Sequence, residues 1–192
     1  MIISNKVLLI VVTCLVLVAV VIRLLPHDPN MTPITALAFV AGLYLGKKWV
    51  FILPGLALLI SDILIGFYDW KIMLSVYVSF LLICLLSLVV TKYRSTLTSG
   101  LSIVGASLLF FLITNAAVWA FSPWYEKTFS GLLYSYELGL PFLRNMLIGD
   151  ILYTVVVVSL FEVVHFLYRR RHELRGALFT NVASPLVYDK FN

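Results

Sequence analysis

Residues 7–33 read VLLIVVTCLVLVAVVIRLLPHDPNMTP, an apolar run over residues 7–25 followed by a polar segment with three prolines. Backbone groups in lipid must be hydrogen-bonded within their own segment, so about 20 mostly apolar residues predict a membrane-spanning helix. The prolines restrict the backbone and favour a loop, after which Pro33 fits the first turn of a second helix. Asn30 or Thr32 is expected to cap that second helix. The stretch therefore predicts two membrane helices joined by a rigid polar loop.

Composition supports a membrane protein over the whole chain. Of the 192 residues, 62% are hydrophobic and 12% are charged, and the mean hydropathy is +1.06. Soluble domains usually hold about 45–50% apolar residues. The net charge of +5 comes from basic residues scattered at the ends of apolar segments, which argues against a nucleic-acid partner. Cys14 and Cys84 lie inside apolar runs, so the sequence offers neither a disulfide framework nor a Cys-rich metal site.

The apolar segments predict an all-α, polytopic bundle of six transmembrane helices. Residues 1–171 are expected to form this single domain, and residues 172–192 a short cytoplasmic C-terminal tail. Pro54 is expected in the first turn of the third span, and the sixth span is expected to begin after Pro141. The predicted spans are Val7–Leu25, Pro33–Gly46, Trp49–Gly66, Ile72–Thr91, Ser99–Phe121 and Phe142–Tyr168.

The positions of Lys and Arg predict the orientation of this bundle. With six spans, ten of the 14 basic residues fall on the side that carries both termini. The positive-inside rule then places both termini in the cytoplasm. We expect a multi-pass protein with the bilayer as its surroundings. The four basic residues on the outer side are Arg23, Lys71, Lys127 and Arg144.

Polar residues within apolar segments are expensive and are therefore candidates for function. Asn115 and Trp119 are four residues apart on one helical face, where they could line a substrate pocket. Asp150 follows Arg144 and Asn145 at the outer end of the sixth span, and these three are also candidate substrate-binding residues. Asp150 could bind a cationic group, pair with Arg144 or have a purely structural role. Asn115 could equally form an interhelical hydrogen bond.

The connection between the fifth and sixth spans, FSPWYEKTFSGLLYSYELGLPFLRN, is long and aromatic. Trp124 and Tyr125 in this connection are candidate substrate-binding residues, because the segment could cover a cavity. Aromatic residues at headgroup depth are also common membrane anchors. Both interpretations stay open at this point.

Other outer residues form a candidate rim or gate, namely His27, Asp28, Asn30 and Asp62. For the first loop, helix capping competes with ligand contact. Ala38, Gly42 and Gly46 recur at intervals of four, a spacing that lets helix backbones approach closely. We expect these three residues to serve helix packing.

Enzyme motifs are absent from the sequence. HExxH, GxSxG, a P-loop and Cys/His metal spacing do not occur. The nearest catalytic pattern is a pair of aspartates, Asp69 and Asp150, which would have to share a proton in order to activate water. We expect no enzymatic activity, no catalytic residue, no metal and no cofactor.

Three stretches carry a resemblance to known proteins: PHDPNMTPITALAFVAGLYLG, PGLALLISDILIGFYDW and VWAFSPWYEKTFSGLLYSYELGLPFLRNMLIGDILYT. Together they resemble a bacterial family of six-span membrane proteins of unknown function, over about residues 23–161. That family is in turn similar to the substrate-binding S components of energy-coupling factor transporters. The resemblance implies an outward-facing cavity built from the outer loops and the outer ends of spans four to six.

The resemblance implies uptake of a small molecule, of a vitamin or precursor type, with a coupling subunit and an ATPase module as partners. One departure is that many S components dock through an AxxxA-type motif in the first helix, where this chain has only Ala19. The alternative is a non-transporting structural or interaction subunit of a membrane complex. An outer cavity lined by Asn115, Trp119 and Asp150 would favour transport, whereas mutual satisfaction of these residues would favour the structural role.

Overall fold

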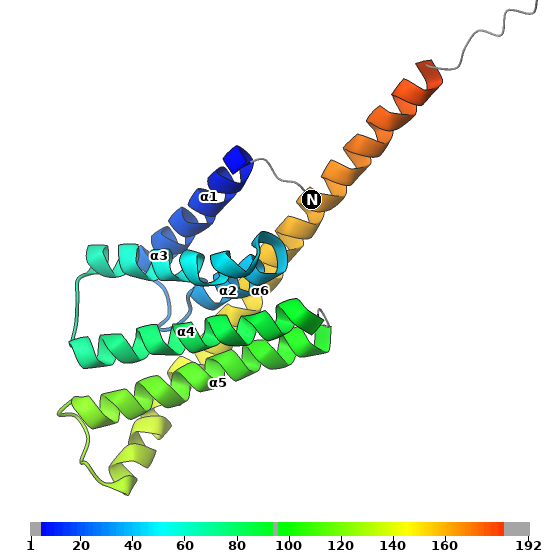
Figure 1. The fold of residues 1–192 in the computed structure, drawn as a ribbon. Coiled ribbons are helices and arrows are strands. Elements are labelled where there is room, and N and C mark those ends of the chain that lie inside the picture. The colour runs from blue at the N-terminus through cyan, green and yellow to red at the C-terminus, as the bar shows by residue number, and fades with distance from the viewer. Residues whose placement is uncertain (1–4, 94–95, 183–192) are drawn as a thin grey trace, which may run out of the picture. The chain divides into compact units, whose positions relative to one another are not determined.

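The computed structural model describes residues 5–93 and 96–182, and its elements in these ranges are helices (Figure 1). Since no strand occurs in the described residues, the predicted all-α class is confirmed. The elements in chain order are α1 (Asn5–Leu24), α2 (Ile34–Val40), the π-helical turn η1 (Ala41–Leu45), α3 (Lys47–Ile65), α4 (Trp70–Tyr93), α5 (Thr96–Phe121) and α6 (Phe129–Val182).

Four helices in the described residues are long and apolar enough to cross a bilayer. Two shorter apolar helices, Leu8–Leu24 and Ile34–Leu45, accompany them. The helices agree with the membrane character inferred from composition, while the count of six spans and the orientation of the termini stay predictions. The four long apolar segments are Lys47–Ile65, Trp70–Val89, Leu97–Phe121 and Phe129–Val164.

The chain divides into two compact units, Met1–Val157 and Val158–Asn192. The first unit contains α1 to α5 and the part of α6 that ends at Val157. The second contains the rest of α6, in which apolar side chains such as Val163 and Phe166 are exposed. Residues 172–182 of the expected tail are helical, and residues 183–192 lie outside the described residues.

The core of the first unit surrounds α2. Every residue of this short helix is buried, and it contacts both α3 and α4. α4 and α5 run side by side (Figure 1), and the rings of Phe80 and Phe110 meet between them with centroids 5.1 Å apart. Enclosure by other helices explains why all residues of α2 except Thr35 are apolar, although the helix is only seven residues long.

The start of α2 differs from the expectation for the first loop. Pro33 itself is the N-cap residue, and no side-chain hydrogen bond caps the helix. The prediction that Asn30 or Thr32 would cap α2 is therefore wrong. Asn30 instead adopts a positive φ of 65°, a conformation that asparagine tolerates better than most residues. The polar side chains of this loop thus have no capping role at α2.

Pro54 lies in the interior of α3 rather than in its first turn, because the helix already begins at Lys47. A proline has no N–H, so the carbonyl of Val50, four residues earlier, lacks its helical donor. The thiol of Cys84 in α4 donates to this Val50 oxygen at 3.0 Å. An interhelical hydrogen bond therefore replaces the missing helical one.

Helix α6 begins before Pro141 and includes it, which corrects the expected start of the last span. Thr128 precedes the helix, and its Oγ1 accepts a hydrogen bond from the Gly131 N–H at 3.1 Å, as an N-cap residue does. Most of the expected long connection is therefore helical. Only residues 122–128 separate α5 from α6.

Candidate functional site

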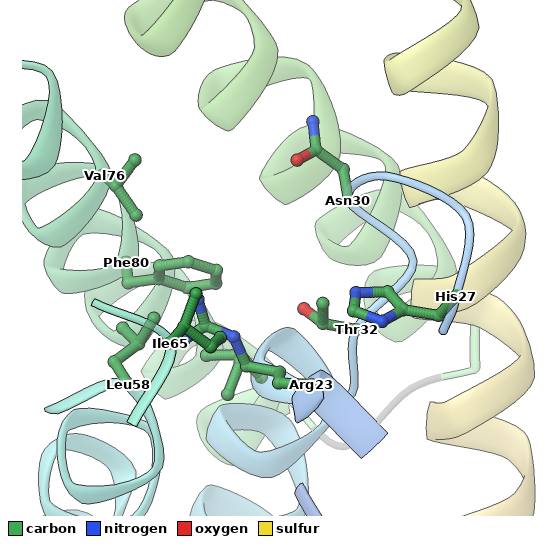
Figure 2. Close-up of a pocket in the computed structure, with 9 residues that line it drawn as sticks. Arg23, His27, Asn30, Thr32, Leu58, Ile65, Val76 and Phe80 are labelled. Atoms are coloured by element: carbon green, nitrogen blue, oxygen red, sulfur yellow. The ribbon is translucent and has the colours of Figure 1, made fainter. Parts of the chain in front are cut away.

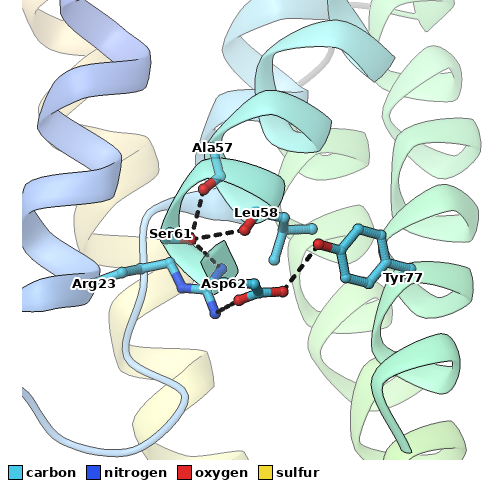
Figure 3. Close-up of polar contacts among 6 residues, drawn as sticks. All are labelled: Arg23, Ala57, Leu58, Ser61, Asp62 and Tyr77. Carbon is cyan, nitrogen blue, oxygen red and sulfur yellow. Dashed lines mark hydrogen bonds and ion pairs between the residues drawn. The ribbon is translucent and has the colours of Figure 1, made fainter. Parts of the chain in front are cut away.

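An ion pair joins the end of α1 to the end of α3 (Figure 3). Arg23 Nη2 donates to Asp62 Oδ1 at 2.9 Å, and the two side chains are 16% and 3% exposed. Both residues occupy the last turn of a mostly apolar helix, so each charge requires a partner close by. The pair balances both charges at one place in the bundle.

Two further hydroxyl groups complete this cluster (Figure 3). Arg23 Nη1 donates to Ser61 Oγ at 2.8 Å, and Ser61 in turn lies within donating distance of the Ala57 carbonyl at 2.6 Å. Tyr77 in α4 donates its phenolic O–H to Asp62 Oδ2 at 3.0 Å. Both carboxylate oxygens are therefore bonded, and the cluster links α1, α3 and α4.

Tyr68, in the connection between α3 and α4, is affected by the same charges. Partial burial, followed by the negative charge of Asp62, raises the pKa of Tyr68 to about 12, although Arg23 opposes this shift. The phenol of Tyr68 therefore stays neutral at any physiological pH. It adds a polar, uncharged group next to the ion pair.

A cavity of about 170 Å³ lies beside Arg23 (Figure 2). We call it the Arg23 cavity. Its lining is amphipathic, because charged and polar residues come from the end of α1 and the loop that follows, whereas most of its apolar residues come from α3 and α4. The polar residues are Arg23, His27, Asn30 and Thr32, and the apolar ones are Ile34, Leu58, Ile65, Val76 and Phe80.

The loop that forms the polar wall is held by its own hydrogen bonds. His27 Nδ1 lies 2.7 Å from the Leu25 carbonyl, which can only accept, so Nδ1 carries the ring hydrogen. In the neutral ring Nε2 is then an acceptor. The Met31 N–H donates to the Asp28 carbonyl at 3.0 Å, closing the turn that contains Asn30. The wall therefore presents both donors and acceptors from a constrained backbone.

The volume of the Arg23 cavity limits what it can hold. An engineered apolar cavity of about 150 Å³ is large enough to bind benzene. The Arg23 cavity therefore has room for a six-membered ring or for a similarly small, partly polar molecule. Among the described residues, no group of three or more His, Cys, Asp or Glu is placed to hold a metal ion.

Asp150 lies in a second polar cluster, formed by three helices. Its Oδ2 is 2.8 Å from Ser107 Oγ of α5, and Thr35 of α2 also hydrogen-bonds to the carboxyl group. Asp150 is 1% exposed, and within the described residues no Lys, Arg or His forms an ion pair with it. Arg144, one of the partners considered for it, is exposed.

Asn115 and Trp119 take part in the contact between α5 and the beginning of α6. Asn115 Nδ2 donates to the Phe111 carbonyl at 2.8 Å, and Asn115 Oδ1 lies against Gly139 of α6. The indole N–H of Trp119 donates to the Glu126 carbonyl at 2.8 Å. The structure thus does not bring these residues together with Asp150 around the Arg23 cavity.

The other predicted substrate-binding residues are also dispersed. Trp124 is 74% exposed, and the rings of Tyr125 and Tyr134 meet edge to face with centroids 6.1 Å apart. Asn145 Nδ2 donates to the Pro29 carbonyl at 3.3 Å, so it fastens α6 to the first loop. Neither Trp124 nor Asn145 lines the Arg23 cavity.

The rim residues are better placed. His27 and Asn30 line the Arg23 cavity. Asp62 accepts a hydrogen bond from Arg23, which also lines this cavity. Asp28 is exposed. Among the residues predicted for packing, Ala38 and Gly42 are buried, whereas Gly46 has a φ of 101° and open space around it. Gly46 therefore permits the turn between η1 and α3 and makes no close helix contact.

Sequence reasoning missed several residues of both clusters. Arg23 was interpreted only as a topology signal, although an arginine in the last turn of an apolar helix also indicates a buried counter-ion. Asp69 Oδ1 accepts hydrogen bonds from the N–H groups of Lys71 and Ile72 and so caps α4. The sequence has no local signal for the missed hydroxyl partners Thr35, Tyr77 and Ser107, because nothing around them distinguishes them from other hydroxyl residues in helices.

The chain belongs to a family of unknown function (DUF6580), whose model matches residues 3–174. This match confirms the predicted membership of a family of unknown function. No curated protein matches the sequence, and no solved structure matches the fold.

Proposed function

We propose that this chain is a membrane-embedded protein that binds a small molecule for uptake, in the manner of the S components of energy-coupling factor transporters. We place it in the bacterial inner membrane with six spans and both termini in the cytoplasm. The observation that carries the proposal is the amphipathic Arg23 cavity, at the ends of α1, α3 and α4. These ends lie on the predicted outer side.

The lining of the cavity indicates a ligand with little net charge. Asp62 already balances the charge of Arg23. Arg23 has five N–H groups, of which two are bonded to Asp62 and Ser61. The remaining donors, together with Thr32 and Asn30, can bind a polar group of the ligand. Small ligand sites typically combine a few such polar groups with an apolar surface.

The opposite wall favours a flat apolar moiety. Phe80, Leu58 and Val76 form this wall, across the cavity from His27 and Thr32 (Figure 2). A small ring that carries one polar substituent fits both the volume and the lining. A vitamin precursor is a compound of this kind.

Transport requires an energy source, and the sequence contains no P-loop for ATP hydrolysis. We propose that a separate coupling subunit and ATPase module supply it. The protein would then cycle between an outward-open and a released state.

A cavity-filling variant tests the proposal. Val76→Phe inserts a ring into the Arg23 cavity, whereas Val78→Phe introduces the same ring at an exposed position on α4. Native mass spectrometry should detect a small molecule that co-purifies with the wild type and with V78F, but not with V76F. Added ligand should raise the unfolding temperature of the wild type and of V78F, and leave that of V76F unchanged.

Recovery of lipid alone, with no stabilisation of the wild type by a panel of small ring compounds, would count against binding. So would equal ligand binding by V76F and V78F. In both cases the Arg23 cavity would be no more than a packing defect or a water site.

The alternative function is an interaction subunit without transport, and one observation favours it. Asn115 donates to a carbonyl of α5 and Trp119 to a carbonyl of the connection between α5 and α6. Trp124 in this connection and Phe129 at the start of α6 are about three-quarters exposed. A protein partner could cover these two rings. Cross-linking from position 124 in native membranes would then recover a protein, and Trp124→Ala would release it without affecting ligand binding.

A further inference from the structure

Asp150 differs from Asp62 because its hydrogen-bond partners in the described part of the chain are hydroxyl groups, with no cationic side chain among them. Asp150, Ser107 and Thr35 are each at most 1% exposed, and they come from α6, α5 and α2. A carboxylate buried without a positive partner is costly in an apolar medium. The carboxyl group must therefore be neutralised by a small cation that reaches it.

Counting hydrogens identifies that cation. Ser107 Oγ lies 2.8 Å from Asp150 Oδ2 and 3.2 Å from the Ile103 carbonyl. The hydroxyl has a single hydrogen to donate. If it donates to Asp150, the contact with the Ile103 carbonyl lacks a hydrogen. If the carboxyl group donates to Ser107 instead, the hydroxyl can donate to the carbonyl, which can only accept. Both contacts are fully satisfied when Asp150 is protonated.

A further oxygen belongs to the same part of α6. Thr154 lies four residues after Asp150 and therefore on the same face of the helix. It is 8% exposed, and its Oγ1 has no hydrogen-bond partner among the described residues. An orphaned buried hydroxyl is rare in proteins and calls for an unseen occupant. A proton-carrying water or a small cation would satisfy it.

We propose that Asp150 is a reversible binding site for a monovalent cation, with the proton as the occupant that its hydrogen-bond geometry favours. Release of the proton converts the carboxyl group to a carboxylate, and the proton passes to water or to a base outside the protein. The carboxylate with the oxygens of Ser107, Thr35 and Thr154 is then a hard-oxygen site that suits Na⁺. The proposed binding of a small molecule in the Arg23 cavity gives no role to Asp150.

Few other ionisable groups face Asp150. α5 and α2 contain none between their first and last residues. On α6 the neighbours in sequence are Arg144, which is exposed, and Tyr153. The loop before α2, whose Met31 lies against Gly149, adds His27 and Asp28, both exposed. A pH effect has to be assigned to Asp150 by comparing variants.

Difference infrared spectroscopy of the purified full-length chain tests the proposal, because a protonated carboxyl group has a C=O band that a carboxylate lacks. Raising the pH should remove one such band from the wild type. D150N should lack the band completely. D69N is the matched control, since asparagine caps a helix as well as aspartate does, and it should retain the band.

Three results would overturn the proposal. They are a wild type without such a band at any pH at which it is folded, a band that survives in D150N, and a band that disappears in D69N. Should D150N fail to fold, S107A supplies a second measurement, because it keeps Asp150 and removes the hydroxyl that contacts it. The band must then change in frequency and in its titration midpoint, and an unchanged band contradicts the site.

Repeating the titration in NaCl and in choline chloride at equal ionic strength distinguishes the two cations. A lower midpoint in NaCl shows that Na⁺ competes with the proton, and T154V should then reduce this shift. Equal midpoints show that the proton is the sole occupant. In that case T154V leaves the titration unchanged. Neither result depends on whether a ligand binds in the Arg23 cavity.

Discussion

Asp62 and Asp150 are both aspartates buried in apolar helices, yet the protein neutralises them in different ways. Asp62 has a guanidinium partner and a phenol donor, both near the Arg23 cavity. Asp150 has the hydroxyl groups of Ser107 and Thr35 and no ion pair among the described residues. The first group is fixed as an anion by a permanent cation. The second depends on a cation that can leave.

This difference indicates which of the two sites can change state. An ion pair with an arginine is permanent, because the guanidinium group stays protonated in proteins. A carboxyl group surrounded by hydroxyls can release its proton to water, or exchange it for another cation, without separating an ion pair between two side chains. We therefore expect the Asp62 cluster to act as a fixed wall of the Arg23 cavity, and Asp150 to be the responsive position.

Replacement of aspartate by asparagine should have a much larger effect at Asp62 than at Asp150. Asp62→Asn leaves Arg23 without a counter-ion in a largely buried position, and breaking such a pair costs about 3 kcal/mol. The free energy of unfolding, measured in mixed micelles of increasing SDS content, should fall by this amount. The double variant that adds Arg23→Met should recover a large part of the loss. If D62N costs no more than D150N, the comparison between the sites fails.

Gly149→Ala tests the packing that holds Asp150 in place. The added Cβ would lie 2.9 Å from Met31 Cγ and 3.1 Å from Met31 Cα, too close without a shift of α6. Overpacking, less the gain in helix propensity, should destabilise the protein by about 1.5 kcal/mol. Gly100→Ala, where nothing lies within 4 Å, is the control and should not destabilise. Equal behaviour of the two variants in the same unfolding assay would contradict a close contact here.

Tyr77→Phe should have a smaller effect, because it removes one donor while the ion pair remains. The loss of a single hydrogen bond to Asp62 is worth about 1 kcal/mol of unfolding free energy. The matched variant Tyr136→Phe removes a phenol that donates to the Leu112 carbonyl at an exposed position, and should cost less. If Y136F proved the more costly of the two, the Asp62 cluster would not be the more strongly bonded site.

The smallest effect is expected for Asp150→Asn at a pH near or below about 4, the ordinary pKa of an aspartate. Asparagine has nearly the shape of a protonated aspartate and can keep the hydrogen bonds to Ser107 and Thr35, so the cost should stay under about 0.5 kcal/mol. As the pH rises above this value, the unfolded wild type loses its proton while the folded protein keeps it, so D150N should become the more stable protein. Unfolding temperatures of both proteins across the pH range check this crossover. A wild type that gains stability over D150N with rising pH would exclude the protonated state.

Much of the fold could be predicted from the sequence, because long apolar runs leave few alternatives to helices in a membrane. The boundaries were less predictable, since Pro54 and Pro141 were expected to mark helix starts. Proline signals a boundary only if nothing else satisfies the carbonyl that it leaves free. At Pro54 that partner is Cys84, which is 30 residues away in sequence. A local rule therefore could not find it.

The candidate site was predictable only in part, for the same reason. His27 and Asn30 could be assigned to an outer rim from their loop, and they line the Arg23 cavity. Asn115 and Asp150 were grouped because both are polar residues in apolar spans. Their partners, however, are set by how α5, α6 and α2 pack. Polarity in an apolar span identifies a residue that needs a partner, and tertiary structure decides which partner it has.

The hydrogen bond from the Cys84 thiol to the Val50 carbonyl also limits which substitutions members of the family can carry at positions 54 and 84. A member with an ordinary residue in place of Pro54 regains the helical donor for the carbonyl at position 50, and its thiol becomes dispensable. A member that keeps the proline but has alanine at position 84 leaves that carbonyl exposed to the apolar interior. Substitutions at positions 54 and 84 should therefore be inherited together, although the two residues are on different helices.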